Sequence, residues 1–301
     1  MNNKRIRILS LFGFMLVMLA VACNQTTESN ENRANLIEFD TIQVNEVYLL
    51  DNKEGYPSCN LQMTLVYPSG SELYDLSQLE SLFICSALGQ DYKNMNIADA
   101  LKGYTEMYIQ NYRADAEVYR RDRPKQKNGA LYGQLYDLDS EVGELPKVFY
   151  SYFETIENEV VYDMNGIISF QVVQVNDKGG VASHEQVFNF TYDLEAEEWI
   201  NEEDVFEPGY DEALRPVIQE LLMAAKGVRT IQELEDLGFF GVEEIIPNNN
   251  ILLTDKGIVY TFNKGEFSAY HLSPAEIVIP YGVVRSLLKE GSPIDRLPAL
   301  K

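Results

Sequence analysis

The chain contains few of the residues from which catalytic and metal centres are usually built. It has two histidines, His184 and His271, three cysteines and one tryptophan among 301 residues. Motifs for a serine nucleophile elbow, a zinc protease, a phosphate-binding loop, a dinucleotide site and a Cys-x-x-Cys pair are missing. Ser286 and Lys289 match Ser-x-x-Lys, but the companion motifs of penicillin-binding proteins are absent. The sequence therefore predicts no catalytic residue, no cofactor and no metal site.

Basic residues are also scarce. Only 24 lysines and arginines stand against 47 aspartates and glutamates, which gives a formal net charge of −23. A charge of this size repels nucleic acid and attracts cationic partners. We therefore expect no nucleic-acid ligand, and the charge has either a partner-steering role or the simpler role of keeping the protein soluble.

The acidic residues are densest around the single tryptophan. Seven acids lie in residues 195–207, around Trp199. This stretch either docks a cationic protein or holds calcium, or it is a solvated turn before a helix, where acids suit the helix dipole. We favour the solvated turn. Asp137, Asp139 and Glu141 have the spacing that opens an EF-hand loop, but a valine replaces the glycine of its sharp turn.

The longest hydrophobic run lies near the start of the sequence. Residues 8–21 are apolar, follow Lys4, Arg5 and Arg7, and end in Leu-Ala-Val-Ala before Cys23. The run is too short for a settled transmembrane helix. It predicts a lipoprotein signal peptide over residues 1–22, with acyl chains such as palmitate on Cys23. The protein would then be anchored in the cell envelope, at the outer membrane, facing either the periplasm or the surface. A cleaved soluble export signal is the alternative, but it leaves the position of Cys23 unexplained.

The other two cysteines allow two interpretations. Outside the cytoplasm, Cys59 and Cys85 could form a disulfide that closes a loop of about 27 residues and contributes on the order of 3 kcal/mol. Two separately buried thiols fit the sequence equally well. The sequence leaves this choice open.

The rest of the chain reads as one α+β protein, an antiparallel meander with flanking helices in two closely associated subdomains. Residues 23–37 are predicted to be a flexible tether, 38–180 an N-terminal α+β subdomain and 181–294 a C-terminal subdomain. Strands and helices come in blocks, which favours α+β over α/β. Alternation and turn residues predict strands over 41–50, 59–67, 149–161, 166–175, 185–192, 252–263 and 275–280. Helical spacing predicts helices over 72–88, 97–120, 210–225, 231–237 and 281–289, and a basic exposed loop over 121–129.

A row of tyrosines marks the second of these helices. Tyr104, Tyr108 and Tyr112 recur every four residues, so they share one face. Such a row could stack on sugar rings or contact a protein partner, but it is more often part of the core. We favour the core.

Several segments resemble a known family. They are CNLQM (59–63), VVYDMNGIISF (160–170), NEEDVF (201–206), LTDKGIVY (253–260) and EIVIPY (276–281). Together they resemble the RsiV-like envelope lipoproteins of Bacteroides-type bacteria. The shared C-terminal module also occurs in a lysozyme-sensing anti-sigma factor and beside a peptidoglycan deacetylase domain, which implies recognition at the cell wall. This chain departs from the family pattern at Ala182, where relatives carry a histidine, and at residues 263–267.

These observations predict a membrane-anchored, non-catalytic envelope lipoprotein whose RsiV-like module binds a cationic protein, such as a lysozyme, or peptidoglycan. One alternative is an envelope hydrolase or deacetylase that uses carboxylates. Another is an accessory subunit of an outer-membrane complex. The candidate ligand-binding residues are Trp199, Glu202, Glu203, Asp204, His184, Tyr270 and His271.

Overall fold

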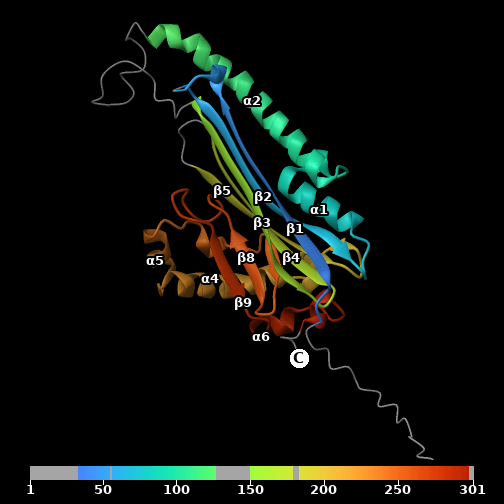
Figure 1. The fold of residues 1–301 in the computed structure, drawn as a ribbon. Coiled ribbons are helices and arrows are strands. Elements are labelled where there is room, and N and C mark those ends of the chain that lie inside the picture. The colour runs from blue at the N-terminus through green and yellow to red at the C-terminus, as the bar shows by residue number, and fades with distance from the viewer. Residues whose placement is uncertain (1–32, 55, 127–149, 179–182, 298–301) are drawn as a thin grey trace, which may run out of the picture. The chain divides into compact units, whose positions relative to one another are not determined.

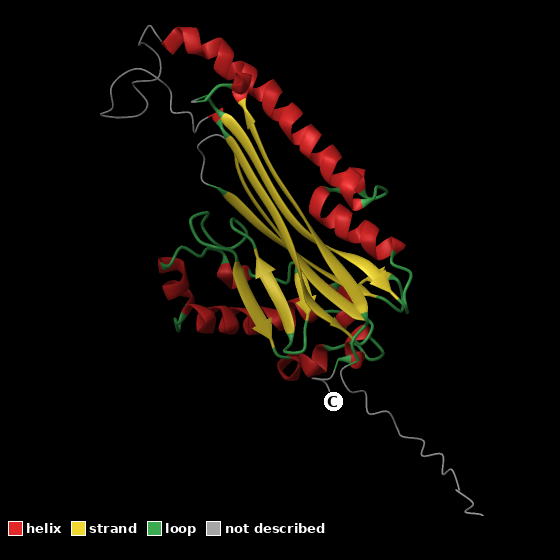
Figure 2. Ribbon diagram, viewed as in Figure 1, coloured by secondary structure: helices red, strands yellow, loops and turns green. Residues whose placement is uncertain are grey.

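The computed structural model describes residues 33–54, 56–126, 150–178 and 183–297, with the backbone alone for 118–126. The fold is α+β, as predicted, with a six-stranded mixed sheet and a three-stranded antiparallel sheet (Figures 1 and 2). The predicted signal peptide, Cys23 and the acids at 137–141 lie outside the described residues. Within the described part, no helix is long and apolar enough to cross a membrane.

The large sheet follows the chain in order, from β1 to β6. Its strands are β1 (Ile37–Leu49), β2 (Ser58–Ser71), β3 (Tyr152–Met164), β4 (Ile167–Lys178), β5 (His184–Asp193) and β6 (Glu198–Trp199). The predicted hairpin and meander are confirmed as antiparallel pairs. The pair β2–β3 is parallel, which the prediction of an antiparallel sheet missed. Parallel neighbours need a long crossover, and here two helices supply it.

Those helices, α1 (Ser77–Leu88) and α2 (Ile97–Gln126), cover one face of the large sheet (Figure 1). The predicted cap of α2 is confirmed, because Asn96 Oδ1 accepts from the Asp99 N–H at 2.9 Å. Helix α1 begins five residues later than predicted, where Asp75 Oδ1 accepts from the Ser77 N–H. The predicted loop from Arg121 is wrong as far as Gln126, because lysine, arginine and glutamine favour helix and α2 continues.

The first core lies between these helices and the sheet. Phe83 of α1 stacks on Phe170 of β4, with ring centroids 4.0 Å apart. Tyr108 and Tyr112 are buried, which confirms that the tyrosine row belongs to the core. Cys59 and Cys85 are both free thiols. Burial, and to a lesser degree the nearby Glu154 carboxylate, raises the pKa of Cys59 to about 12.

The C-terminal part builds a second core against the opposite face of the sheet. It contains α3 (Glu202–Val205), α4 (Tyr210–Lys226), α5 (Ile231–Asp236), β7 (Ile251–Leu253), β8 (Ile258–Phe262), β9 (Ala275–Ile279) and α6 (Tyr281–Val284). Helix α4 packs on β9, and β7 packs on β4 and β5. The predicted capping box of Thr230 and Glu233 is confirmed. The last helix is shorter than predicted, since the chain becomes 3₁₀-helical at Arg285.

Asparagine side chains close the outer edge of β5. Asn263 Oδ1 accepts from the Val187 N–H at 2.8 Å, and Asn263 Nδ2 donates to the Val187 carbonyl at 3.0 Å. Asn250 Oδ1 accepts from the Asn189 N–H at 2.7 Å. These amides occupy the positions that a neighbouring strand would fill, so the edge has few unpaired backbone groups. These hydrogen bonds also attach the segments that flank β7 and β8 to β5. The strands β4 and β5, which lie on either side of the subdomain boundary predicted at residue 180, pair in one sheet.

Candidate functional site

A groove of about 1110 Å³ lies between α1 and the strands at the far side of the large sheet. It forms because α1 and α2 pack mainly on β1–β3 and leave part of β5 and β6 uncovered. Phe188 and Phe190 are two residues apart in β5, so both side chains point to the same face of the sheet, the one that α1 and α2 cover. Trp199 of β6 lies beside them, with its ring centroid 5.4 Å from that of Phe190. These three rings form an aromatic wall.

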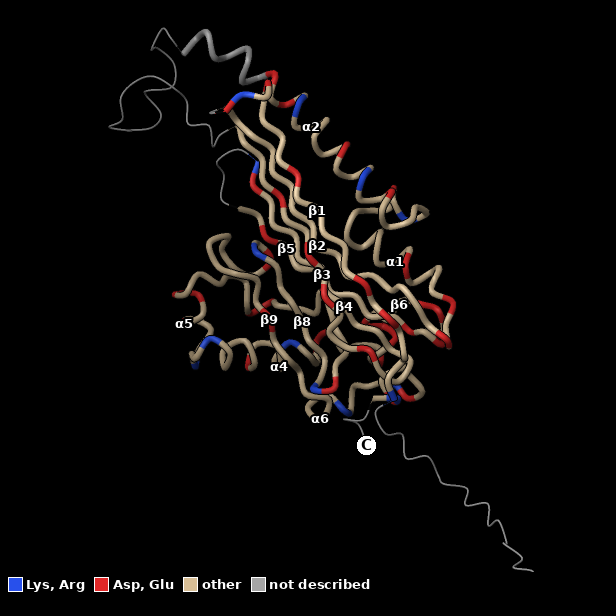
Figure 3. Tube along the Cα trace, viewed as in Figure 1, with Lys and Arg blue, Asp and Glu red and all other residues tan. Residues whose placement is uncertain are grey.

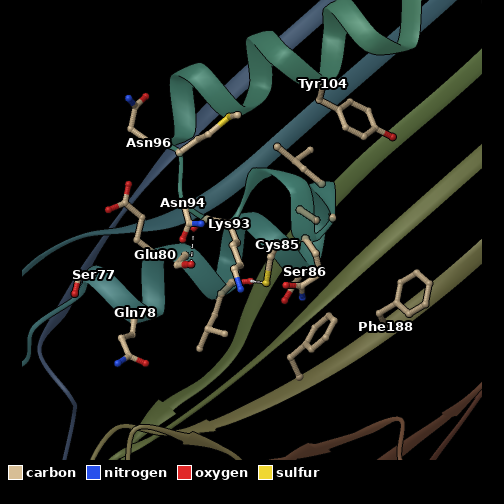
Figure 4. Close-up of a pocket in the computed structure, with 18 of the residues that line it drawn as sticks. Ser77, Gln78, Glu80, Cys85, Ser86, Lys93, Asn94, Asn96, Tyr104 and Phe188 are labelled. Carbon is tan, nitrogen blue, oxygen red and sulfur yellow. Dashed lines mark hydrogen bonds between the residues drawn. The ribbon is translucent and has the colours of Figure 1, made fainter. Parts of the chain in front are cut away.

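The opposite side of the groove is polar. Figure 4 shows Cys85 and Ser86 on the part of α1 that faces the strands, with Lys93 and Asn94 next to them. The remaining polar groups of the lining are mostly amides and hydroxyls, from Ser77, Gln78, Ser81, Gln90, Asn96 and Gln174. Glu80 and Lys93 are the charged residues that line it. An aromatic wall opposite amides and hydroxyls suits a polar, mainly uncharged ligand.

A smaller pocket of about 300 Å³ lies between α2 and β3. Tyr104 is the one described residue that lines both cavities. Glu154 of β3 is buried in this pocket and accepts a hydrogen bond from the Tyr104 hydroxyl at 3.0 Å. Burial raises the pKa of Glu154, an effect that the Tyr104 hydrogen bond and the charge of Lys178 only partly oppose.

The structure distributes the predicted site residues over three places. Trp199 lies in the groove. His184, at the other end of β5, pairs with Tyr270, with ring centroids 6.2 Å apart. His271 lies nearby, beside Gly238. Glu203 and Asp204 are exposed on α3. The seven residues therefore do not converge on one site, and their role in ligand binding stays a prediction.

Glu202 differs from its acidic neighbours. It is 4% exposed, so the predicted solvated turn is wrong at this position. Its carboxylate accepts from the Asn249 N–H at 2.6 Å and from the Tyr210 hydroxyl at 2.9 Å. Burial raises its pKa, while these hydrogen bonds act in the opposite direction. The other acids of the stretch fit the prediction better, since Asp204 caps α3 by accepting from the Asn201 N–H.

The sequence reasoning missed the polar side of the groove and the whole α2–β3 pocket. One signal was available, because Glu154 occupies an inward position in a strand that alternates. Among the residues that the structure describes, no group of three or more histidines, cysteines or acids is placed to hold a metal ion.

Acidic residues are spread along the helices and strands that the structure describes (Figure 3). No single described element therefore accounts for the net charge of −23 of the full sequence.

Comparison with known proteins places the chain in a family. A model of DUF3298, described as a protein of unknown function, matches residues 203–282. A crystal structure of a DUF3298 family member from Bacteroides fragilis NCTC 9343 matches with 30% identity and a TM-score of 0.74, covering 88% of this chain and 98% of that one. A DUF3298 family protein from Pseudomonas aeruginosa PAO1 matches with 13% identity and a TM-score of 0.54, covering 87% and 97%. The second match shows a shared fold alone.

A comparison with curated proteins finds no significant match. Because the Bacteroides fragilis protein is 30% identical over nearly its whole length, the chain belongs to the DUF3298 family.

Proposed function

We propose that the protein is a lipid-anchored, non-catalytic protein of the cell envelope that binds its ligand in the groove between α1 and β5–β6. The observation that carries this proposal is the aromatic wall of Phe188, Phe190 and Trp199, opposite a side rich in amides and hydroxyls. Recognition surfaces of this kind bind through ring faces and a few directed hydrogen bonds. The signal-like sequence before Cys23 supports attachment to a membrane through lipid.

The groove composition favours a cell-wall glycan as the ligand. Sugar rings present apolar faces for stacking and hydroxyls for amide partners, and Glu80 and Lys93 leave the lining nearly neutral. The resemblance to RsiV-like lipoproteins also supports recognition at the cell wall. The net charge supports a different partner, a cationic protein such as a lysozyme. We put the glycan first because it matches the groove itself.

The test is retention on insoluble peptidoglycan of residues 33–301, the segment that contains every residue the structure describes. We expect Trp199→Ala to weaken binding about ten-fold, as loss of a central aromatic anchor does. Phe240→Ala is the control, because Phe240 is an exposed aromatic residue that does not line the groove. Equal retention of the wild type and the Trp199 variant would reject the groove as the glycan site. Salt-sensitive binding to lysozyme without binding to peptidoglycan would favour the cationic partner.

The lipid anchor has a separate test. Cells that express the full chain should incorporate labelled palmitate into this protein, and Cys23→Ser should abolish the label. Label that persists in the Cys23 variant would reject Cys23 as the attachment site.

A second candidate function, an envelope hydrolase or deacetylase, is favoured by one observation. Glu154 is a buried carboxyl in a pocket, with a raised pKa, as general acids often have. Release of product from muropeptides by the wild type, lost in Glu154→Gln, would bring this candidate forward. Absence of such activity would reject this second candidate.

A further inference from the structure

We propose that the pocket between α2 and β3 binds an alkylammonium group, as carried by a lysine side chain or a small primary amine. Apart from Tyr104, the pocket and the groove have no described lining residue in common. The proposal therefore does not depend on which ligand the groove accepts.

Two reciprocal hydrogen bonds frame the pocket. Tyr104 of α2 donates to Glu154 of β3 at 3.0 Å, and Tyr152 of β3 donates to Asp115 of α2 at 2.6 Å. Each of the two elements, α2 and β3, therefore contributes one carboxylate, which accepts a hydrogen bond from a tyrosine of the other element. A carboxylate has about four acceptor positions. One tyrosine hydroxyl leaves most of that capacity available for a ligand that donates several hydrogen bonds.

A third tyrosine of the pocket lining has a hydroxyl with unused hydrogen-bonding capacity. Tyr108 lines the pocket and is 5% exposed. Its hydroxyl has no hydrogen-bond partner among the residues that the structure describes. A buried hydroxyl without a partner is costly, so a polar group that came within reach of this oxygen would gain a hydrogen bond. Burial and the nearby Glu154 carboxylate both raise the pKa of Tyr108, so the hydroxyl stays neutral.

The charge and the rings both select a cation. Glu154 and Asp115 contribute two acids to the lining, and Lys178, at the exposed end of β4, contributes one base. The rings of Tyr104 and Tyr108 lie nearly parallel, 9° apart, with centroids separated by 6.5 Å. Aromatic faces beside carboxylates attract ammonium groups through cation–π and ionic interactions.

The size of the pocket limits the ligand to one side chain or a comparable amine. Its volume of about 300 Å³ is at the lower end of the range for ligand pockets. An apolar stem can lie against Met107 and Ala114, which also line the pocket, while the ammonium group reaches the carboxylates.

The experiment is a calorimetric titration of residues 33–301 with n-butylammonium and with the peptide Ala-Lys-Ala, capped at both ends. The same peptide with an acetylated lysine is the neutral control. We expect both ammonium ligands to bind and the acetylated peptide to bind at least about ten-fold more weakly. A higher affinity for the peptide would indicate that the natural ligand is a lysine side chain of a protein. A higher affinity for n-butylammonium would indicate that it is a small free amine. Equal binding of the acetylated peptide, or no binding of either ammonium ligand, would overturn the proposal.

Three variants test the residues. Glu154→Gln keeps the shape of the side chain but removes its charge, so ammonium binding should fall about ten-fold. Glu157→Gln is the matched control, because it removes the same charge from an exposed position of the same strand and should change binding little. Lys178→Met removes the competing cation and should strengthen binding. Unchanged binding in Glu154→Gln, or weaker binding in Lys178→Met, would reject the pocket as an ammonium site.

Tyr108→Phe tests the pocket with a change that should not disturb folding. It removes one oxygen from the pocket and leaves the ring in the core. We expect it to weaken ammonium binding without lowering stability, since the lost hydroxyl has no described partner. Unchanged affinity in this variant would contradict the role of the hydroxyl.

Discussion

Two buried glutamates, one in each core, show how similar chemistry can have different consequences. Glu154 and Glu202 are 7% and 4% exposed, and each accepts from a tyrosine hydroxyl. Burial raises the pKa of both. Glu202 also accepts from a backbone N–H, and its own N–H donates to Asn249. Glu154, by contrast, accepts one hydrogen bond among the described residues, from the Tyr104 hydroxyl. Its side chain also lines a cavity.

The difference separates a structural carboxylate from a candidate binding carboxylate. Both oxygens of Glu202 are occupied, and its bonds join the start of α3 to the loop before β7. Glu154 keeps acceptor capacity beside an opening that a ligand can enter. Hydrogen-bond saturation and access, rather than burial or pKa, therefore distinguish the two groups.

The largest effect is expected from Glu202→Ala. The variant leaves the Asn249 N–H and the Tyr210 hydroxyl without their acceptor in a buried site. We expect a loss of about 3 kcal/mol in the free energy of unfolding, measured by urea denaturation. Glu203→Ala, at the exposed neighbouring position, should change stability by about 0.5 kcal/mol or less. A loss of unfolding free energy in Glu202→Ala as small as that in Glu203→Ala would contradict the structural role of Glu202.

A smaller effect of opposite sign is expected from Glu154→Gln. The folded protein raises the pKa of Glu154, so ionisation favours the unfolded state. The stability that the neutral carboxyl provides is complete below the unfolded pKa of about 4.3, and it is lost as the pH rises through the folded pKa. Glutamine stays neutral, so the variant should be more stable than the wild type at pH 7.

The measurement for this prediction is a series of urea transitions between pH 4 and pH 8. The stability difference between the wild type and Glu154→Gln should shrink toward the acidic end. A difference that grows on acidification would show that the pKa of Glu154 is lowered in the folded state. Glu202→Gln should not stabilise the protein at pH 7, because an amide cannot reproduce both of its accepted hydrogen bonds.

The sequence predicted the parts of this fold that local patterns determine. Alternation and turn residues predicted the hairpin and the meander, and the Asn96 and Thr230 caps marked two helix starts. The parallel pairing of β2 with β3 depends on how a two-helix crossover returns to the sheet, which no local pattern encodes. The asparagines that close β5 come from loops more than 50 residues away, so their pairing has no local signal either.

The candidate site was harder to predict for the same reason. Trp199 was identified from its acidic surroundings, but its aromatic neighbours and the amides of α1 meet only through the tertiary fold. Glu154 was overlooked because an acid in an alternating strand is usually on the solvent side. The tyrosine row was correctly assigned to the core at Tyr108 and Tyr112, while Tyr104 lines both cavities.

The smallest predicted effect concerns the thiols. Cys59 is buried and its pKa is raised to about 12 by burial and by the Glu154 carboxylate, whereas Cys85 lines the open groove. A thiol reagent applied to residues 33–301 without denaturant should therefore modify Cys85 well before Cys59. Glu154→Gln should speed the labelling of Cys59 about two-fold by removing a repulsive charge, and Glu202→Gln should not. Mass spectrometry of the labelled peptides distinguishes the two sites. Equal rates for Cys59 in both variants would show that Glu154 exerts no electrostatic effect on the Cys59 thiol.

The most direct test of the contrast between the two glutamates is an NMR titration of tyrosine-labelled protein with n-butylammonium. If Glu154 marks a binding pocket and Glu202 a closed structural contact, the chemical shifts of the Tyr104, Tyr108 and Tyr152 rings will change as n-butylammonium is added. These changes will level off as the pocket becomes saturated. Signals of Tyr210 and Tyr260, beside Glu202, will stay in place. Shifts of similar size in both groups, or no shift at the pocket tyrosines, would contradict the account.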